Sequence, residues 1–96
     1  MMSEPTSRLS PDQVQTIARV LADPRRFAIL KQIAQQATMT CSALDVKQCI
    51  SAATISHHVK ALQEADLIDV EREGRSARLT LRRDVWDAYL HELASL

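Results

Sequence analysis

The polar residues that could carry chemistry are concentrated in one short run, Ser56-His57-His58, with Lys60 two residues later. A serine nucleophile needs a base within hydrogen-bond reach and an acid that orients this base. Such groups come together from distant parts of a fold rather than from adjacent positions of one helix. The run also has no acid at a suitable spacing. We therefore expect no catalysis and predict that the chain is not an enzyme.

The two cysteines, Cys41 and Cys49, are the only thiols of the chain. If the segment between them is a continuous helix, their separation corresponds to a rise of about 12 Å. This distance is too long for a disulfide or a shared metal ion within one subunit. Cys49 is expected to be buried like a small apolar residue. Cys41 lies near a helix start that could lower its thiol pKa, and it is the redox candidate.

Asp87 and His91 are four residues apart and would share one face of a helix. They could hold a metal ion only weakly and only across a dimer, because zinc takes four ligands. The alternative is an ordinary charge pair on a helix surface. Because this segment has a single histidine, we predict no metal site and no cofactor.

Arginine is concentrated in one segment, although the twelve basic and twelve acidic side chains of the whole chain cancel. Residues 72–83 contain five arginines and one glutamate, a local net charge of +4. Residues 84–96 contain three acids and no lysine or arginine, and residues 51–61 contain no acid. Arginines neutralise phosphates and enter minor grooves, so this distribution favours DNA as a partner. The arginine-rich segment alone is equally compatible with a solubilising surface.

Two segments that contain proline predict the first helices. Ser10-Pro11 and Asp23-Pro24 each place a capping side chain before a proline suited to the first helical turn. The first helix is expected to end near Ala22, because the residue before a proline avoids helical geometry. The second helix is expected to fade at Gln35-Gln36.

Two short helices follow in the arrangement of a helix-turn-helix. Thr40 could cap the first of them, and the second spans residues 51–65. His58 lies beside the inner stripe of the second helix, where packing and a local hydrogen bond are its expected role. That stripe consists of Ile55, Val59 and Leu62.

The hydrophobic period changes after Asp66. Apolar residues alternate on both sides of Gly74, which can adopt a positive φ, so residues 68–81 are predicted to form a two-stranded hairpin. Asp84 is expected to open a last helix. This order of elements predicts a mainly α fold with a small β-hairpin, namely a winged helix-turn-helix.

Composition excludes several other classes. Gly74 is the only glycine, whereas nucleotide-binding loops need several. No apolar run approaches the length of a membrane span, so no membrane partner is expected. Two cysteines are compatible with a reducing compartment, and we expect a cytoplasmic protein. Residues 1–9 are expected to be a flexible tail and residues 10–96 a single domain.

Four segments in register resemble the ArsR/SmtB family of bacterial repressors. Residues 21–30, LADPRRFAIL, resemble the family's opening LADPTRLxIL, and residues 51–62, SAATISHHVKAL, resemble its recognition helix SxSTVSHHLKxL. Residues 64–68 are similar to its EAGLV segment, and residues 72–75 are similar to its wing tip. The resemblance covers about residues 14–82. It implies a homodimeric, operator-binding repressor that is often released from DNA by a metal ion or another signal.

The predicted function is sequence-specific repression through the helix 51–65 and the wing 68–81, on a palindromic double-stranded operator. The alternative is a winged-helix module that binds a protein and has no specific DNA target. Small, hydrogen-bonding residues on the outer face of the helix let base edges come within reach. The DNA-binding candidates are Ser51, Ala53, Thr54, Ser56, His57, Lys60, Arg72, Arg75 and Arg78.

The first and last helices are expected to form the dimer, because the last helix carries more apolar surface than a small monomer can cover. The sequence does not identify an effector that would release the protein from DNA. Arsenic and cadmium sensors of the family that this chain resembles carry Cys-x-Cys where this chain has Thr40-Cys41-Ser42. The zinc sensors of that family use at least two histidines of the last helix, where this chain has only His91. The dimer-interface candidates are Val14, Leu21, Val85, Trp86, Tyr89, Leu90 and Leu93.

Overall fold

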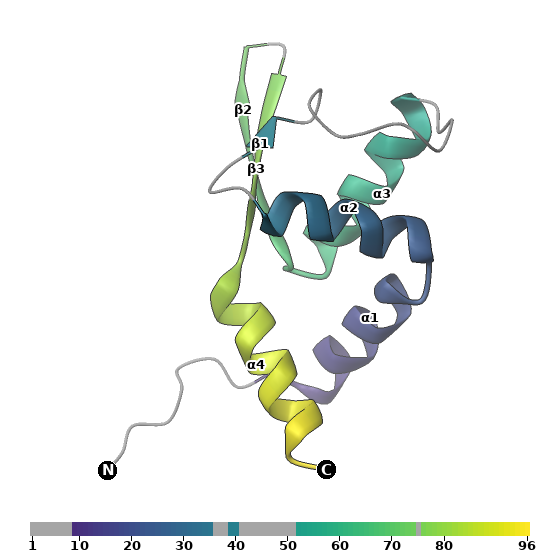
Figure 1. Ribbon diagram of the computed structural model, residues 1–96, viewed down its shortest axis with the longest axis vertical. Helices are drawn as coiled ribbons and strands as arrows, with labels where there is room; N and C mark the ends of the chain where they lie inside the picture. Colours follow the sequence, from purple (N-terminus) through teal and green to yellow (C-terminus); the bar gives the residue numbers. More distant parts are fainter. Residues whose placement is uncertain (1–8, 36–38, 41–51, 75) are drawn as a thin grey trace.

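A β-hairpin projects at one end of the molecule, and the C-terminal helix lies at the other end (Figure 1). This computed structural model describes residues 9–35, 39–40, 52–74 and 76–96. The predicted third helix lies outside these residues, as do Cys41, Cys49, Ser51, Arg75 and nearly all of the predicted tail. The described elements agree with the predicted fold class, mainly helical with a hairpin before the last helix.

Side-chain caps fix the starts of the first two helices. α1 spans Pro11–Leu21, and Ser10 forms a capping box with Gln13. The Gln13 amide donates to Ser10 Oγ over 3.1 Å, and the Ser10 amide donates to Gln13 Oε1 over 3.0 Å. α2 spans Pro24–Ala34, and the Asp23 carboxylate accepts a 2.8 Å hydrogen bond from an amide of its first turn. These bonds satisfy amides that a helix start leaves unpaired, and they confirm the predicted starts of both helices.

β3 (Ser76–Leu81) is the central strand of a sheet ordered β1–β3–β2. It forms the predicted hairpin with β2 (Ile68–Glu73), and Gly74 adopts a φ of 62° in the turn, as expected. β1 (Met39–Thr40) pairs antiparallel with the other edge of β3. The sequence predicts only two strands, because a pair of residues is too short to show an alternating pattern.

α3 spans Ala52–Glu64, which matches the predicted recognition helix to within one residue at each end. Its predicted inner stripe is buried. After the helix, Asp66 has a φ of 62°, in the left-handed region. The Asp66 amide donates to Gln63 O over 2.9 Å, and the Leu67 amide donates to Leu62 O over 3.0 Å. Such bonds close a helix C-terminus, usually with glycine as the left-handed residue.

α4 spans Arg83–Ala94 and begins one residue before Asp84, which corrects the predicted start. Arg82 is the N-cap residue, and its Nη2 donates to Asp84 Oδ2 over 3.0 Å. A carboxylate in the first turn is stabilised by the helix dipole whether or not it is the cap, so its presence does not fix the boundary. The Arg82 amide also donates to Leu67 O over 2.8 Å, which ties the start of α4 to the residue directly before β2.

A single buried apolar cluster joins the described helices to the sheet. At the edge of this core, Arg83 Nη2 on α4 donates to Ala34 O, at the last turn of α2, over 3.4 Å. No helix within the described ranges is long and apolar enough to cross a membrane. The largest fully buried side chains are Ile17, Ile33, Leu62, Leu67, Ile68 and Leu79.

Candidate nucleic-acid interface

α3 presents mostly polar side chains to solvent on the side opposite its buried stripe. Its first turn contains no acid. Of the predicted base-contacting residues on this helix, Thr54 is half-buried and Ser51 lies outside the described residues. A face of this kind can approach base edges in a major groove, because the exposed candidates nearest the start of the helix have small side chains. The exposed candidates are Ala53, Ser56, His57 and Lys60.

His58 lies on the buried side of the same helix, with 3% of its surface exposed. Arg26 Nε on α2 donates to His58 Nδ1 over 3.2 Å. Nδ1 is therefore an acceptor, and the neutral ring carries its proton on Nε2. Within the described residues, Nε2 has no hydrogen-bond partner. The expected packing of His58 is confirmed, but its hydrogen bond is not local as expected, because the partner belongs to another helix.

Burial lowers the pKa of His58 below its usual value, because an apolar surrounding disfavours the charged ring. The Asp23 carboxylate acts in the opposite direction, whereas Arg26, Arg25 and His57 add to the lowering of this pKa. The backbone amide of Arg25 in turn holds the pKa of Asp23 below its ordinary range. His58 is therefore neutral at neutral pH, which its contact with Arg26 requires.

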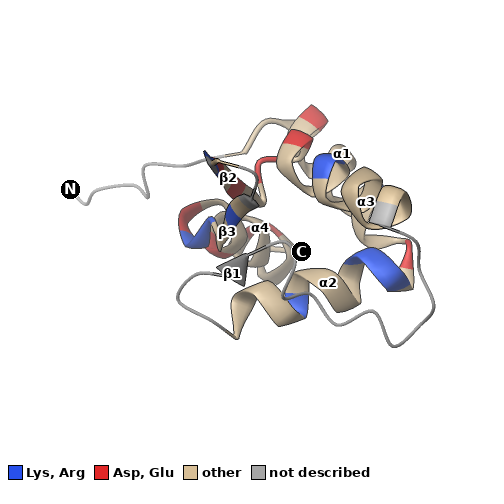
Figure 2. Ribbon diagram, turned by 90° about the horizontal axis from the view of Figure 1, so that it is seen from above, with Lys and Arg blue, Asp and Glu red and all other residues tan. Residues whose placement is uncertain are grey.

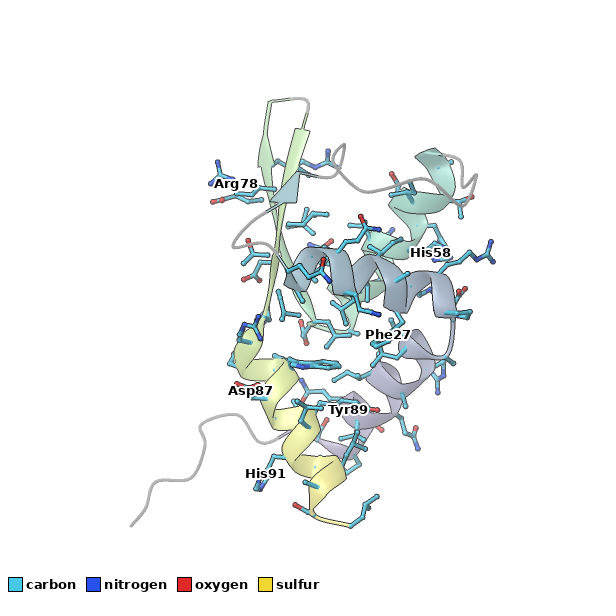
Figure 3. The ribbon with its side chains drawn as sticks, in the orientation of Figure 1. Phe27, His58, Arg78, Asp87, Tyr89 and His91 are labelled. Atoms are coloured by element: carbon cyan, nitrogen blue, oxygen red, sulfur yellow. The ribbon has the colours of Figure 1, made fainter. Side chains whose placement is uncertain are left out.

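The hairpin arginines differ in how far their charge is compensated. Arg72 is exposed, and Arg75 lies outside the described residues. Arg78 is half-buried and stands directly opposite Glu71 on β2, with 3.9 Å between Arg78 Nη1 and Glu71 Oε1. Figure 3 places Arg78 on the hairpin, well separated from His58. Glu71 precedes the arginine-rich segment by one residue, so the local charge count misses it.

The last two arginines of that segment lie at the base of the sheet rather than at the hairpin tip. The hydrogen bond between Arg82 and Asp84 raises the pKa of the guanidinium and lowers that of the carboxyl group. Arg83 is engaged with the last turn of α2. The local net charge of +4 therefore overstates the positive charge that the hairpin offers to a phosphate.

The predicted dimer residues separate into buried and exposed groups. Val85 and Tyr89 are 4% and 8% exposed and belong to the core of the chain itself. Tyr89 points from α4 towards α1 (Figure 3). Leu90 and Leu93 are 44% and 46% exposed, and they are the members of the predicted set that a second chain could cover. The remaining members, Val14, Leu21 and Trp86, are partly buried against the core.

Asp87 and His91 lie on the same side of α4, away from Tyr89 (Figure 3). Among the described residues, no group of three or more His, Cys, Asp or Glu side chains is placed to hold a metal ion. The two residues therefore have no third ligand from the described part of their own chain. Both cysteines lie outside that part, so the redox prediction for Cys41 stays a prediction.

Sequence comparisons match the chain to known regulators. The profile of a family described as "Helix-turn-helix domain" matches residues 21–71. An uncharacterized HTH-type transcriptional regulator, YceK of Bacillus subtilis (strain 168), is 31% identical over 88% of this chain and 87% of its own length. An arsenical resistance operon repressor of Staphylococcus xylosus is 30% identical over 82% of this chain and 75% of its own length.

The structure is similar to solved winged helices. A homodimeric winged helix-turn-helix DNA-binding domain from Mycobacterium bovis, described as a possible ArsR-family transcriptional regulator, superimposes with a TM-score of 0.70. The match has 25% sequence identity and covers 93% of this chain and 89% of that domain.

Proposed function

Because the chain belongs to the ArsR family of helix-turn-helix transcriptional regulators, we propose that it is a repressor that binds a specific DNA operator as a homodimer. The observation that carries this proposal is the exposed polar face of α3, which has no acid in its first turn and is held in place by a buried apolar stripe. In the proposal α3 enters the major groove, and the β2–β3 hairpin contacts the neighbouring backbone or minor groove. The naming of a relative as an arsenical resistance operon repressor supports repression as the outcome.

The homodimer rests on apolar surface that the protomer leaves uncovered. Leu90 and Leu93 are exposed on α4, and Trp86 beside them is only partly buried. Large apolar side chains of this kind are typical anchors of protein interfaces. The homodimeric state of the similar domain from Mycobacterium bovis supports the same assembly here. A two-fold dimer would place two copies of α3 about 34 Å apart, one turn of DNA, so we propose a palindromic operator.

The test begins with an operator selected by the wild-type protein from a library of random duplex DNA. Ser56→Ala and His57→Ala should each weaken binding to this operator by about 1–3 kcal/mol and change binding to random DNA little. Gln63→Ala, on the exposed C-terminal part of α3, is the matched control and should leave both affinities unchanged. Equal losses on the operator and on random DNA would contradict base reading by this face.

A protein-interaction module is the second candidate, and the compensation of Arg78 by Glu71 favours it to some extent. The two functions differ in their dependence on salt. A protein that neutralises phosphates loses DNA affinity steeply as the salt concentration rises. A weak DNA affinity without this slope, and no enriched operator after selection, would favour the protein-interaction module.

A further inference from the structure

The first turn of α2 contacts α3 through one directional bond. Arg26 and His58 are 32 residues apart in the chain and joined by the 3.2 Å hydrogen bond from Nε to Nδ1. The neighbouring Arg25 is more exposed, and its Nε lies 3.7 Å from Asp23 Oδ1 instead. Figure 2 shows basic residues at an end of α2, and this helix packs against α3. Two adjacent arginines therefore have different partners, and only one of them reaches the recognition helix.

We propose that Arg26 is a positioning residue for DNA recognition, which acts through His58 to fix the orientation of α3 against α2. This inference rests on the DNA-binding function proposed above. His58 directly follows Ser56-His57, the exposed pair that faces the bases in that proposal. Its ring centroid is 6.0 Å from that of His57. A change in the rotation or tilt of α3 at His58 therefore moves both base-facing side chains.

Apolar packing alone fixes the orientation of α3 against α2 less precisely than the hydrogen bond from Arg26 to His58 does. The stripe of α3 packs through Ile55, Val59 and Leu62, and burial of such side chains is favourable in many orientations because the hydrophobic effect has no direction. A hydrogen bond weakens steeply when its angle is distorted. The guanidinium Nε has a single N–H, so its bond to a buried ring nitrogen restrains the direction as well as the distance between the two helices.

The contact also makes the orientation of α3 sensitive to protonation. A proton on Nδ1 would turn the acceptor into a donor that faces the donor of Arg26, and it would add a positive charge in a buried position. The charged and titratable groups that act on the ring are Asp23, Arg25 and Arg26 from the start of α2 and His57 from α3. Because burial lowers the pKa of His58, the contact persists at neutral pH and is lost when the pH falls well below 6.5.

The experiment compares Arg26→Gln with Arg25→Gln, which removes the same charge from the adjacent position and leaves the bond to His58 intact. Circular dichroism first checks that both variants are folded. Both should weaken binding to random DNA by the same small factor. Only Arg26→Gln should further weaken binding to the selected operator, by about tenfold, the size expected for one hydrogen bond. Equal ratios of operator to random-DNA affinity in the two variants would overturn the positioning role.

A second variant, His58→Asn, keeps an acceptor near the position of Nδ1 and does not titrate. It should bind the operator nearly as well as the wild type at pH 7.5, and it should lack the loss of specificity that the wild type shows as the pH is lowered well below 6.5. Identical pH profiles for the wild type and His58→Asn would contradict the proposal.

The tautomer of His58 separates this inference from the proposed function. Long-range ¹H–¹⁵N spectra of the wild type should show His58 with its proton on Nε2, and Arg26→Gln should lose this fixed tautomer. One outcome is a fixed tautomer of His58 but no operator that can be selected. This outcome would overturn the repressor function and the positioning role that depends on it, but it would leave the hydrogen bond between Arg26 and His58 established. A selectable operator bound equally well by Arg26→Gln and Arg25→Gln would overturn the positioning role alone.

Discussion

Glu71 and Arg78 lie directly opposite each other on β2 and β3, with 3.9 Å between the carboxylate and guanidinium atoms. Both side chains are substantially exposed, so the pair contributes little to folding stability. The pair instead affects the electrostatic potential of the hairpin surface, because the Glu71 carboxylate makes this potential less positive. The wing is thus less basic than its arginine content indicates.

Replacing Glu71 by glutamine should therefore strengthen binding to DNA of any sequence. The expected gain is about two- to fivefold in affinity, which corresponds to an exposed ion pair of up to about 1 kcal/mol. Fluorescence anisotropy over a range of salt concentrations measures it. Asp69→Asn is the control, because Asp69 is also exposed on β2 but stands opposite Thr80 rather than an arginine. An equal gain from Asp69→Asn would mean that only the net charge matters.

Leu93→Glu should dissociate the proposed dimer. A carboxylate at an apolar contact is buried without a partner when the dimer forms, which costs several kcal/mol. Sedimentation should show a dimer for the wild type at micromolar concentration and a monomer for the variant. His91→Glu adds the same side chain to α4 on the side that carries Asp87, and it should remain a dimer. A wild-type monomer, or equal dissociation of both variants, would contradict the assigned interface.

Asp66→Gly should stabilise the fold, and Asp66→Ala should destabilise it. Asp66 has a φ of 62°, which glycine adopts without strain, whereas a Cβ makes this conformation costly. Aspartate tolerates it better than alanine does, so the expected order of stability is Gly, Asp, Ala. The two variants should differ by about 1 kcal/mol in the free energy of unfolding, measured by urea denaturation. A more stable alanine variant would contradict the left-handed assignment.

Metal ions should change operator affinity little. Arsenite and cadmium prefer several thiolates that converge on one point, and this chain has two cysteines. Within the described part of the chain, the zinc ligands considered are Asp87 and His91 with their copies in a second chain, and no group of three ligands forms in one chain. Saturating zinc, cadmium or arsenite in reducing buffer should therefore change the affinity by less than about tenfold, a coupling below about 1.4 kcal/mol. A hundredfold loss at stoichiometric metal would contradict this, and Cys41→Ser would then be the first variant to test.

Features that depend on neighbouring residues were predictable from the sequence. Ser10 and Asp23 cap their helices through hydrogen bonds to residues two or three positions away. Gly74 marks the hairpin turn because its conformational freedom is a property of the residue itself. The outward face of α3 follows from the position of its apolar stripe, since the period of a helix is fixed.

Features that depend on through-space contacts were not predictable in this way. The bond from Arg26 to His58 links residues of different helices, and neither residue type specifies the other. The same limit applies to α4, where Tyr89 and Leu90 are adjacent in the sequence, yet one is buried and the other exposed. An apolar stripe shows which side of a helix is hydrophobic, but it does not show where the core of the chain ends and the free surface begins.

The strand order β1–β3–β2 also affects how the protein behaves at high concentration. Because β3 is paired on both sides, only β1 and β2 have open edges within the described sheet. An unpaired edge is a template for aggregation unless it is short or charged. β1 has two residues, and β2 carries exposed charged side chains at Asp69, Glu71 and Arg72. Neither edge therefore offers a long apolar template to another chain, and the sheet is protected against fibre-like stacking.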